Sequence, residues 1–245
     1  MPQRGDHQGT DGTCAGHQHA LPGHLPGAAD RPDPGLVQRL GEYSSATIHE
    51  AQGRLGALSS RIKPVDDAMS LCGPAFTVRC APRDNIMLQV AIACARPGDV
   101  IVVSAGEYAE AGSFGDVLAN ACVAKGLGGL ITDTGVRDTR ELRELGFPVF
   151  SLSVSIKGTV KETVGPMAEP VLIGGEIVRP GDVVRGDADG VVVVRREDLG
   201  ETVRRSQERV DAEAGYIAAY RAGKSVIEVS GLAAVLEAKG LVIDE

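Results

Sequence analysis

The residues best suited to chemistry are Asp116 and, after a gap of twenty residues, the adjacent pair Arg137-Asp138. A carboxylate is a preferred ligand of hard divalent cations. A guanidinium beside it can stabilise negative charge that develops on a neighbouring oxygen. A second carboxylate within reach can hold or move a proton. This combination suits chemistry on an enolate, and it favours an enzyme over a scaffold.

The positions of these residues along the chain support that interpretation. Asp116 and the pair each follow a predicted strand and a loop, which is where α/β proteins commonly place their sites. The loop before Asp116, residues 106–115, contains three glycines and precedes a helix. Such a loop can direct backbone N–H groups at a carboxylate or phosphate. We therefore expect a pocket for an anion next to a metal.

A simpler reading of Arg137-Asp138 stays open at this point. The run Asp138-Thr-Arg-Glu141 resembles a capping box, in which Asp138 would cap the following helix. Arg137 would then be an ordinary surface charge. Both readings place the pair at the start of a helix.

Helical and strand patterns alternate along most of the chain. Helices are predicted at residues 46–55 (capped by Ser44 or Ser45), 85–94, 116–125 (ending at Gly126), 139–145 (ending at Gly146), 197–222 and 231–239. Strands are predicted at residues 75–80, 100–104, 129–132 (with Asp133 just past its end), 148–152 and 191–194. This pattern predicts one α/β domain with a mixed sheet, from about residue 36 to residue 245.

Composition excludes several classes of function. The net charge of −8 opposes general affinity for nucleic acid, and an aromatic content of 3% without Trp opposes base stacking. The five cysteines show no C-x-x-C spacing, which favours free thiols in a reducing cytoplasm. The sequence has no apolar run of the roughly 18 residues that span a membrane. Its N-terminus lacks the apolar core of a signal peptide. We expect a cytoplasmic protein without nucleic-acid or membrane partners.

Residues 1–35 differ in composition from the rest of the chain. They contain four of the five histidines, many Gly and Pro residues, and almost no apolar periodicity. The histidines could form a metal-binding tract, but their spacing is irregular. We therefore predict a disordered N-terminal tail.

The spacing of Asp116 and Arg137-Asp138 resembles the signature of the class II pyruvate aldolases, which share a fold with the regulator of ribonuclease activity A. The likeness extends, in order, through Ala46-Thr-Ile-His-Glu-Ala-Gln-Gly-Arg-Leu-Gly56, Gly106-Glu107, Lys157-Gly-Thr-Val-Lys-Glu-Thr163, Pro180-Gly-Asp-Val183 and Asp189-Gly-Val-Val-Val-Val194. It covers residues 40–200, about two-thirds of the chain. Noncatalytic relatives keep much of the same scaffold. The resemblance implies a single-domain layered α/β/β/α sandwich with a mixed sheet.

The resemblance also implies how the residues are used. Asp138 would bind a Mg²⁺ or Mn²⁺ ion, with waters filling most other positions. The pyruvyl end of the substrate would chelate this metal, and Arg137 would face the keto oxygen. Backbone amides of the 106–110 loop (Gly106, Glu107, Tyr108 and Ala109 in particular) would hold the substrate carboxylate. Asp116 would orient or deprotonate a metal-associated water.

Two further positions match residues of these aldolases. Glu50 corresponds to a helical glutamate that reaches the site from a neighbouring subunit, and Lys161 to a lysine suited to the distal carboxylate of the substrate. Glu213 could also cross an interface, although a plain surface position is favoured. Gln89 stands where these aldolases commonly have a histidine, and a Gln cannot titrate or carry positive charge. The presence of Gln89 would affect recognition of the far end of the substrate, or a proton transfer there.

The resulting expectation is a metal-dependent carbon–carbon lyase acting on a small 2-oxo acid, with a role in aromatic compound degradation. The substrate would be 4-hydroxy-4-methyl-2-oxoglutarate or 4-carboxy-4-hydroxy-2-oxoadipate, and oxaloacetate decarboxylation would be a side activity. Two alternatives stay open, a protein that is mainly an oxaloacetate decarboxylase and a noncatalytic ribonuclease-regulator-like binding protein. A site shared between subunits requires a homo-oligomer, and the resemblance implies a homotrimer or a dimer of trimers.

Overall fold

Parallel strands form the centre of the molecule. The computed structural model describes residues 31–241. Across the large sheet the strands follow the order β1 (Lys63–Pro64), β6 (Val149–Val154), β5 (Gly129–Val136), β3 (Val100–Ser104), β2 (Leu71–Arg79), β9 (Val183–Asp187) and β10 (Gly190–Val194). The eighth strand, β4 (Gly112–Phe114), pairs with the carboxyl end of β5.

The sheet is mixed, as predicted. Strands β2, β3, β5 and β6 are parallel to one another and β4 is parallel to β5, whereas β1, β9 and β10 are antiparallel to their neighbours. Strands β7 (Val171–Ile173) and β8 (Glu176–Val178) form a separate antiparallel hairpin. Because parallel strands end at the same edge, the residues that follow β3 and β5 lie near each other.

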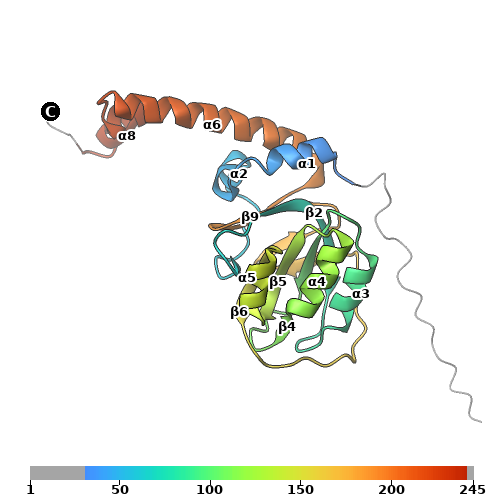
Figure 1. Cartoon of the computed structure of the whole chain (residues 1–245). Coiled ribbons are helices and arrows are strands. Elements are labelled where there is room, and N and C mark those ends of the chain that lie inside the picture. The colour runs from blue at the N-terminus through green and yellow to red at the C-terminus, as the bar shows by residue number, and fades with distance from the viewer. Residues whose placement is uncertain (1–30, 242–245) are drawn as a thin grey trace, which may run out of the picture.

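Alternating side chains on the strands separate two apolar cores. Ile101 and Val103 on one face of β3 are buried in a core shared with α3 (Ile86–Cys94), α4 (Asp116–Lys125) and α5 (Thr139–Leu145). Val100 and Val102 on the other face are buried with side chains of β9, β10 and the β7–β8 hairpin. Figure 1 shows α3, α4 and α5 lying together over one face of the sheet.

A third core lies on the outer face of β9 and β10. There Val183, Val192 and Val194 pack against α1 (Pro34–Leu40), α2 (Ser45–Ala51) and α6 (Leu199–Arg221). The order of layers is therefore helices, the parallel part of the sheet, the β9–β10 part with the hairpin, and helices again. This is the predicted α/β/β/α sandwich.

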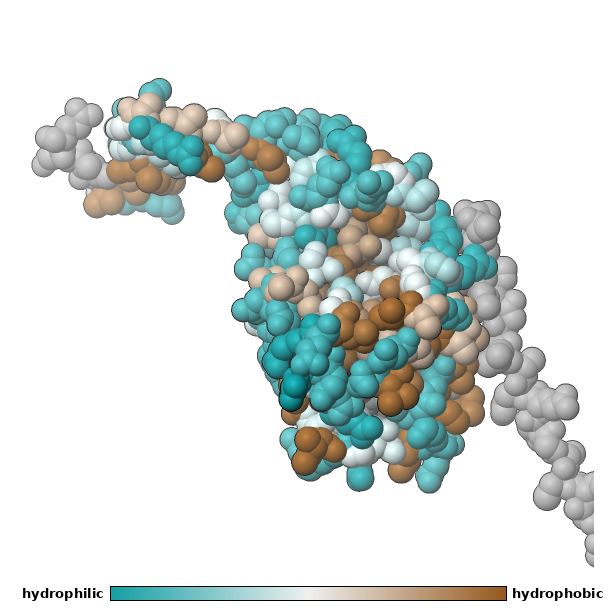
Figure 2. Space-filling view, in the orientation of Figure 1, coloured by the Kyte–Doolittle hydropathy of each residue, from teal (hydrophilic) through white to brown (hydrophobic). Residues whose placement is uncertain are grey.

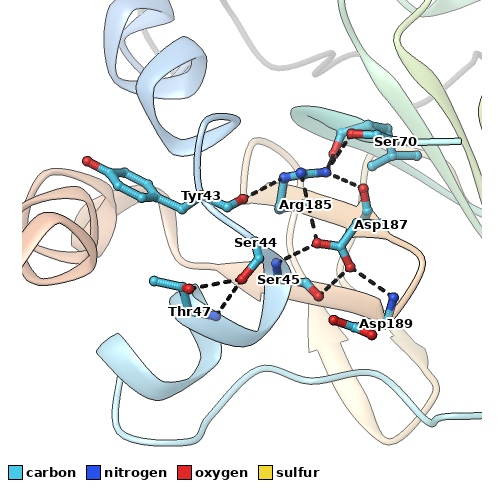
Figure 3. Close-up of polar contacts among 10 residues, drawn as sticks. Tyr43, Ser44, Ser45, Thr47, Ser70, Arg185, Asp187 and Asp189 are labelled. Atoms are coloured by element: carbon cyan, nitrogen blue, oxygen red, sulfur yellow. Dashed lines mark hydrogen bonds and ion pairs between the residues drawn. The ribbon is translucent and has the colours of Figure 1, made fainter. Parts of the chain in front are cut away.

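A buried polar cluster attaches the α1–α2 segment to the sheet (Figure 3). The guanidinium of Arg185, which is 8% exposed, donates to the carbonyl of Tyr43 at 3.0 Å and to the hydroxyl of Ser70 at 2.8 Å. Asp187 accepts hydrogen bonds from the backbone N–H and the hydroxyl of Ser45, at 2.7 and 2.6 Å. Burial would raise the pKa of Asp187, but the Ser45 hydrogen bonds, together with the Asp189 N–H and the charge of Arg185, outweigh it and the pKa is lowered.

Helix α6 projects from the body and carries α7 (Val226–Ser230) and α8 (Leu232–Ala238) at its far end (Figure 1). It follows a short 3₁₀ turn, Arg196–Asp198. Apolar side chains such as Tyr216 and Val235 are exposed on this arm, and Figure 2 shows brown surface there. Within residues 31–241 the cysteines are free thiols, and no helix has the length and apolar character needed to cross a membrane.

Most predicted elements are present, with local differences. Helices α4 and α5 end at Gly126 and Gly146, which are in the left-handed conformation. Helix α2 ends at Ala51 rather than residue 55, because the chain reverses through Gly53 and Arg54 at positive φ. Helix α1 begins at Pro34, two residues before the expected start of the domain. Residues 1–30, which make up most of the predicted tail and contain the four histidines, lie outside the described residues.

Two predictions near the site were wrong in their boundaries. Strand β5 continues to Val136, so Asp133 lies inside the strand rather than past its end. The region predicted as a loop, residues 106–115, contains the short strand β4. Both additions extend the edge of the sheet where Asp116, Arg137 and Asp138 lie.

Candidate functional site

The candidate site forms where β5 ends and the N-termini of α4 and α5 meet. Asp116 is the first residue of α4, and Arg137-Asp138 connects the end of β5 to α5. Asp116 and the Arg137-Asp138 pair, with twenty residues between them in the sequence, are thus brought together as predicted. The Arg137 and Asp138 side chains are 48% and 38% exposed, so the site is open to solvent.

The Asp138 carboxylate does not cap its own helix. Asp138 has left-handed backbone angles (φ 56°, ψ 41°), and its side chain makes no capping hydrogen bond to α5. Instead its Oδ2 accepts a hydrogen bond from the backbone N–H of Asp116 at 3.2 Å. The Arg137 Nε lies 3.5 Å from the same oxygen. The capping-box reading is therefore wrong, and the carboxylate is directed at the N-terminus of α4.

Two glycines permit this close approach. A Cβ on Gly115 would lie 2.2 Å from the Asp138 Oδ2 and 3.0 Å from the Arg137 Cγ. A Cβ on Gly112 would lie 2.3 Å from the carbonyl oxygen of Ser155 and 3.1 Å from the Arg137 Cβ. Gly112 and Gly115 thus have a steric role, because any larger residue would displace the Arg-Asp pair.

The Asp116 side chain is held by its own helix. Its Oδ1 accepts a hydrogen bond from the Nδ2 of Asn120 at 2.8 Å. Asn120 lies one turn further along α4 and also donates to the Asp116 carbonyl at 3.0 Å. The carboxylate of Asp116 is partly exposed, so it remains accessible from solvent.

Asp133 supports the loop that follows β3. It is a buried carboxylate that was not predicted to belong to the site. It is 1% exposed and accepts hydrogen bonds from the N–H of Ala105 at 2.5 Å and of Glu107 at 3.2 Å. Burial raises the pKa of Asp133 above its ordinary value although these hydrogen bonds favour the charged form. An acidic residue directly after an apolar strand was the signal in the sequence.

Two hydroxyl groups fix the next part of the loop. Thr134 donates to the carbonyl of Tyr108 at 2.6 Å, and Ser153 donates to the carbonyl of Ala109 at 2.5 Å. The backbone N–H groups of Ala109 and Glu110 have no acceptor among residues 31–241. The loop therefore has its carbonyl groups tied to β5 and β6 while two successive N–H groups are available to a ligand.

The segment 155–163 forms a wall beside the site. It begins where the N–H of Ser155 donates to the carbonyl of Val136 at 2.9 Å, and it passes β4, where the Gly112 N–H donates to the Lys157 carbonyl at 2.8 Å. Lys161, on this wall, is exposed and has no ion pair within the described part of the chain.

Gln89 is linked to this edge of the sheet through Asn85. The Gln89 Nε2 donates to the Asn85 Oδ1 at 3.1 Å, and the buried Asn85 Nδ2 donates to the carbonyl of Ser113, in β4, at 2.9 Å. The position where the aldolases commonly have a histidine therefore holds an amide that donates to another amide.

Glu50 and Glu213 are not brought to the site within one chain. Glu50 lies on α2, in the opposite outer layer, with Arg54 Nε at 3.2 Å and Arg209 at 3.7 Å. Glu213 on α6 pairs with the same Arg209 at 2.9 Å. Any role of Glu50 at the site requires a second copy of the chain, and this stays a prediction.

The residues present can supply a single carboxylate ligand to a metal. Within residues 31–241 no group of three His, Cys, Asp or Glu side chains is arranged to hold an ion. The Asp138 Oδ1 has no partner in that range and is available as a single ligand. A hard cation that keeps most of its waters, such as Mg²⁺ or Mn²⁺, fits this arrangement.

Comparisons with known proteins agree with the fold described above. Residues 45–193 match the RraA-like family, described as Aldolase/RraA. A protein of Halalkalibacterium halodurans named "Putative 4-hydroxy-4-methyl-2-oxoglutarate aldolase" is 34% identical over 174 residues, which cover 71% of this chain and 83% of that protein.

Solved structures show the same architecture. RraAS2 of Streptomyces coelicolor, described as an unusual member of the RNase ES inhibitor RraA protein family, is 32% identical with a TM-score of 0.67, covering 75% of this chain and 97% of that one. An uncharacterized protein from Pseudomonas syringae pv. tomato, at 23% identity, has a TM-score of 0.71 and covers 82% of this chain and 98% of that one. The second likeness concerns the fold alone. The chain belongs to the RraA-like (Aldolase/RraA) family.

Proposed function

We propose that the protein is a divalent-metal-dependent pyruvate aldolase. It would cleave 4-hydroxy-4-methyl-2-oxoglutarate or 4-carboxy-4-hydroxy-2-oxoadipate into pyruvate and a second 2-oxo acid. The observation that carries this proposal is the direction of the Asp138 carboxylate, which leaves its own helix and lies with Arg137 at the N-terminus of α4. A noncatalytic scaffold has no need for this exposed and conformationally costly arrangement.

The loop after β3 is suited to the carboxylate of the pyruvyl group. Successive N–H groups without protein acceptors favour an anion, and those of Ala109 and Glu110 have no acceptor within the described residues 31–241. Gly106, Glu107 and Tyr108 complete the loop, and Asp133 keeps it in place through the Glu107 N–H. Arg137 would face the keto oxygen, on which negative charge develops during cleavage.

A bound Mg²⁺ or Mn²⁺, with Asp138 as its protein ligand, would act as a Lewis acid that lowers the energy of the enolate. In the cleavage itself the 4-hydroxyl group loses its proton, the C3–C4 bond breaks, and its electron pair forms the enolate of pyruvate. Protonation at C3 completes the product. Asp116, through an ordered water, would take up the first proton and return one to C3. Asn120 keeps the Asp116 carboxylate oriented for this transfer.

The far end of the substrate would be bound by groups outside this centre. Lys161 is exposed without an ion-pair partner in residues 31–241, and it would bind the distal carboxylate. Glu50 would approach from a second copy of the chain in a homotrimer or a dimer of trimers. This placement suits the location of Glu50 in the outer layer opposite α4 and α5.

Oxaloacetate decarboxylation is the closest competing activity, because it passes through the same enolate. The presence of Gln89 favours oxaloacetate decarboxylation. The Gln89 amide donates to Asn85, and an amide cannot titrate or carry the positive charge of a histidine. Cleavage of a long hydroxy acid would lose a proton-transfer group there, whereas loss of CO₂ from oxaloacetate requires no such group.

The test is pyruvate release, coupled to lactate dehydrogenase and NADH, with each hydroxy-oxo acid and with oxaloacetate in separate reactions. Each would be run with Mg²⁺ and with EDTA. Metal-dependent turnover of a hydroxy-oxo acid well above that of oxaloacetate supports the aldolase. Turnover of oxaloacetate alone identifies a decarboxylase. No turnover of any substrate would contradict an enzyme and favour a binding protein.

A further inference from the structure

A buried carboxylate outside the proposed catalytic centre, Asp84, holds the wall that carries Lys161. Asp84 is 3% exposed, and its Oδ2 accepts hydrogen bonds from the N–H groups of Glu162 at 2.8 Å and Thr163 at 2.7 Å. Its Oδ1 accepts one from the N–H of Ile86, in the first turn of α3, at 2.9 Å. A single side chain thus joins α3 to a segment 78 residues away.

The backbone around Asp84 reinforces this attachment. The Val160 N–H donates to the Arg83 carbonyl at 2.9 Å, and the Asn85 N–H donates to the Val160 carbonyl at 3.2 Å. Lys161 therefore lies between two residues, 160 and 162, that are both bonded to the 83–85 corner. Between the bridge at Val160 and the next bridge, where Met167 pairs with Val78 of β2, the segment belongs to no helix or sheet. The contacts with residues 83–85 are therefore the ones nearest to Lys161 that hold its backbone.

The same corner is connected to the proposed centre. Asn85 donates through its side chain to the Ser113 carbonyl in β4, at 2.9 Å. Strand β4 leads directly through Gly115 into Asp116. The distance between Lys161 and Asp116 is thus set by two attachments to one corner, Asp84 on one side and Asn85 on the other.

From this arrangement we infer that Asp84 is a positioning residue that determines the preference for substrates with a distal carboxylate. It does so by fixing the backbone on both sides of Lys161 relative to Asp116. This inference rests on the proposed function, because it assumes that Lys161 binds the distal end. Pyruvate itself has no distal carboxylate, so its reaction at C3 should not depend on Asp84.

The charge state of Asp84 suits this role. Burial alone would raise the pKa of its carboxyl, but the N–H groups of Ile86, Glu162 and Thr163 outweigh burial, and the pKa is lowered. The group is therefore ionised at neutral pH, and it binds these N–H groups as a charged acceptor. Charged acceptors form hydrogen bonds roughly twice as strong as neutral ones.

The test compares Asp84→Asn, Lys161→Met and the double variant in two assays. The first is the steady-state cleavage of 4-carboxy-4-hydroxy-2-oxoadipate. The second is exchange of the pyruvate methyl protons with solvent deuterium, followed by NMR. We expect each single variant to raise KM for cleavage roughly tenfold, the loss of a charge-assisted contact. Methyl exchange should remain within about twofold of the wild type, and the double variant should be no worse than Asp84→Asn.

A matched pair of variants separates positioning from folding. Thr163→Pro removes the N–H and the hydroxyl of Thr163, both of which favour the charged Asp84 carboxylate, while the sequence of the 83–85 corner is kept. It should raise KM as Asp84→Asn does. Glu162→Ala alters an exposed side chain but keeps the backbone N–H, and it should have no effect. This pair keeps the inference testable if Asp84→Asn does not fold.

Three results would overturn the inference. Equal loss of cleavage and methyl exchange in Asp84→Asn would mean a general structural role. Multiplicative effects of Asp84→Asn and Lys161→Met would mean that the two residues act independently. Unchanged KM in Thr163→Pro would mean that the attachment does not matter for binding. A wild-type protein that exchanges no methyl protons would instead overturn the proposed function, so the two failures are distinguishable.

Discussion

Asp138 shows how one backbone conformation determines what a side chain can do. A left-handed conformation at a non-glycine residue costs on the order of 1 kcal/mol, and Asp138 adopts it at φ 56°. This conformation directs the carboxylate away from α5, so that it accepts a hydrogen bond from the N–H of Asp116. The helix N-terminus carries a partial positive charge that favours this carboxylate. The geometry of the proposed centre thus depends on Asp138 and on the space that its neighbours leave.

Gly115→Ala tests that dependence. The added methyl group would lie 2.2 Å from the Asp138 Oδ2, so the Arg-Asp pair must move. A displacement of about 1 Å can cost roughly a hundredfold in rate, and we expect that loss in pyruvate methyl exchange. Gly158→Ala is the control, because no atom lies within 4 Å of a Cβ there. Full activity in Gly115→Ala would show that the position of Asp138 does not matter.

At the scale of single residues, the sequence indicates which residues form the proposed centre but not the directions of their side chains. The spacing of Asp116 and Arg137-Asp138 was enough to predict that they meet, because it places them after neighbouring parallel strands. Whether Asp138 caps α5 or leaves it depends on its φ, and both options share the same local sequence. Asp133 was missed as a supporting residue because its partners, Ala105 and Glu107, lie on another strand's loop.

Among the elements, the loop after β3 depends on long-range contacts. Its carbonyl groups are bound by hydroxyls from β5 and β6, through Thr134 and Ser153. These bonds hold the loop carbonyls, whereas the N–H groups of Ala109 and Glu110 have no acceptor among residues 31–241. Affinity for an anion should therefore depend on hydroxyl groups that never touch it.

Ser153→Ala tests this arrangement. The variant leaves the Ala109 carbonyl without its donor, a loss of about 1 kcal/mol. We expect kcat/KM for pyruvate methyl exchange to fall roughly fivefold, mainly through KM. Ser60→Ala is a suitable control, because Ser60 is exposed and its hydroxyl has no partner in the described part of the chain. An unchanged KM in Ser153→Ala would argue against the loop as the carboxylate site.

The boundaries of helices and strands could be predicted from the sequence where local chemistry determines them. Gly126 and Gly146 end α4 and α5 because a left-handed residue closes each helix. Strand β4 was missed because its three residues, within a glycine-rich loop, form a strand only by pairing with β5. The polar end of β5 carries no alternating apolar pattern. Its pairing with β6 likewise could not be predicted from the local sequence.

On the scale of the whole molecule, the layers separate Glu50 from the proposed centre. Glu50 lies with α2 and α6 on one outer face, and α4 and α5 cover the other. A site that uses Glu50 must therefore combine two copies of the chain. The order of the layers could be predicted from the family resemblance, whereas the arrangement of copies could not be derived from one chain.

Subunit complementation tests the shared site. Glu50→Gln and Asp138→Asn should each be inactive alone. When the two are unfolded together and refolded as mixed oligomers, about a quarter of the sites would combine an intact Glu50 with an intact Asp138. We expect about that fraction of wild-type activity. Recovery of none, with mixed oligomers shown by mass spectrometry, would place Glu50 outside the site.

The central claim is that Asp116, Arg137 and Asp138 form a metal-dependent centre for the enolate of pyruvate. The most direct measurement is exchange of the pyruvate methyl protons in deuterium oxide, because it does not require the physiological substrate. We predict exchange by the wild type with Mg²⁺ or Mn²⁺, none with EDTA, and a loss of at least roughly a thousandfold in Asp138→Asn. Exchange that persists in EDTA or in Asp138→Asn, or no exchange by the wild type with either metal, would contradict this claim.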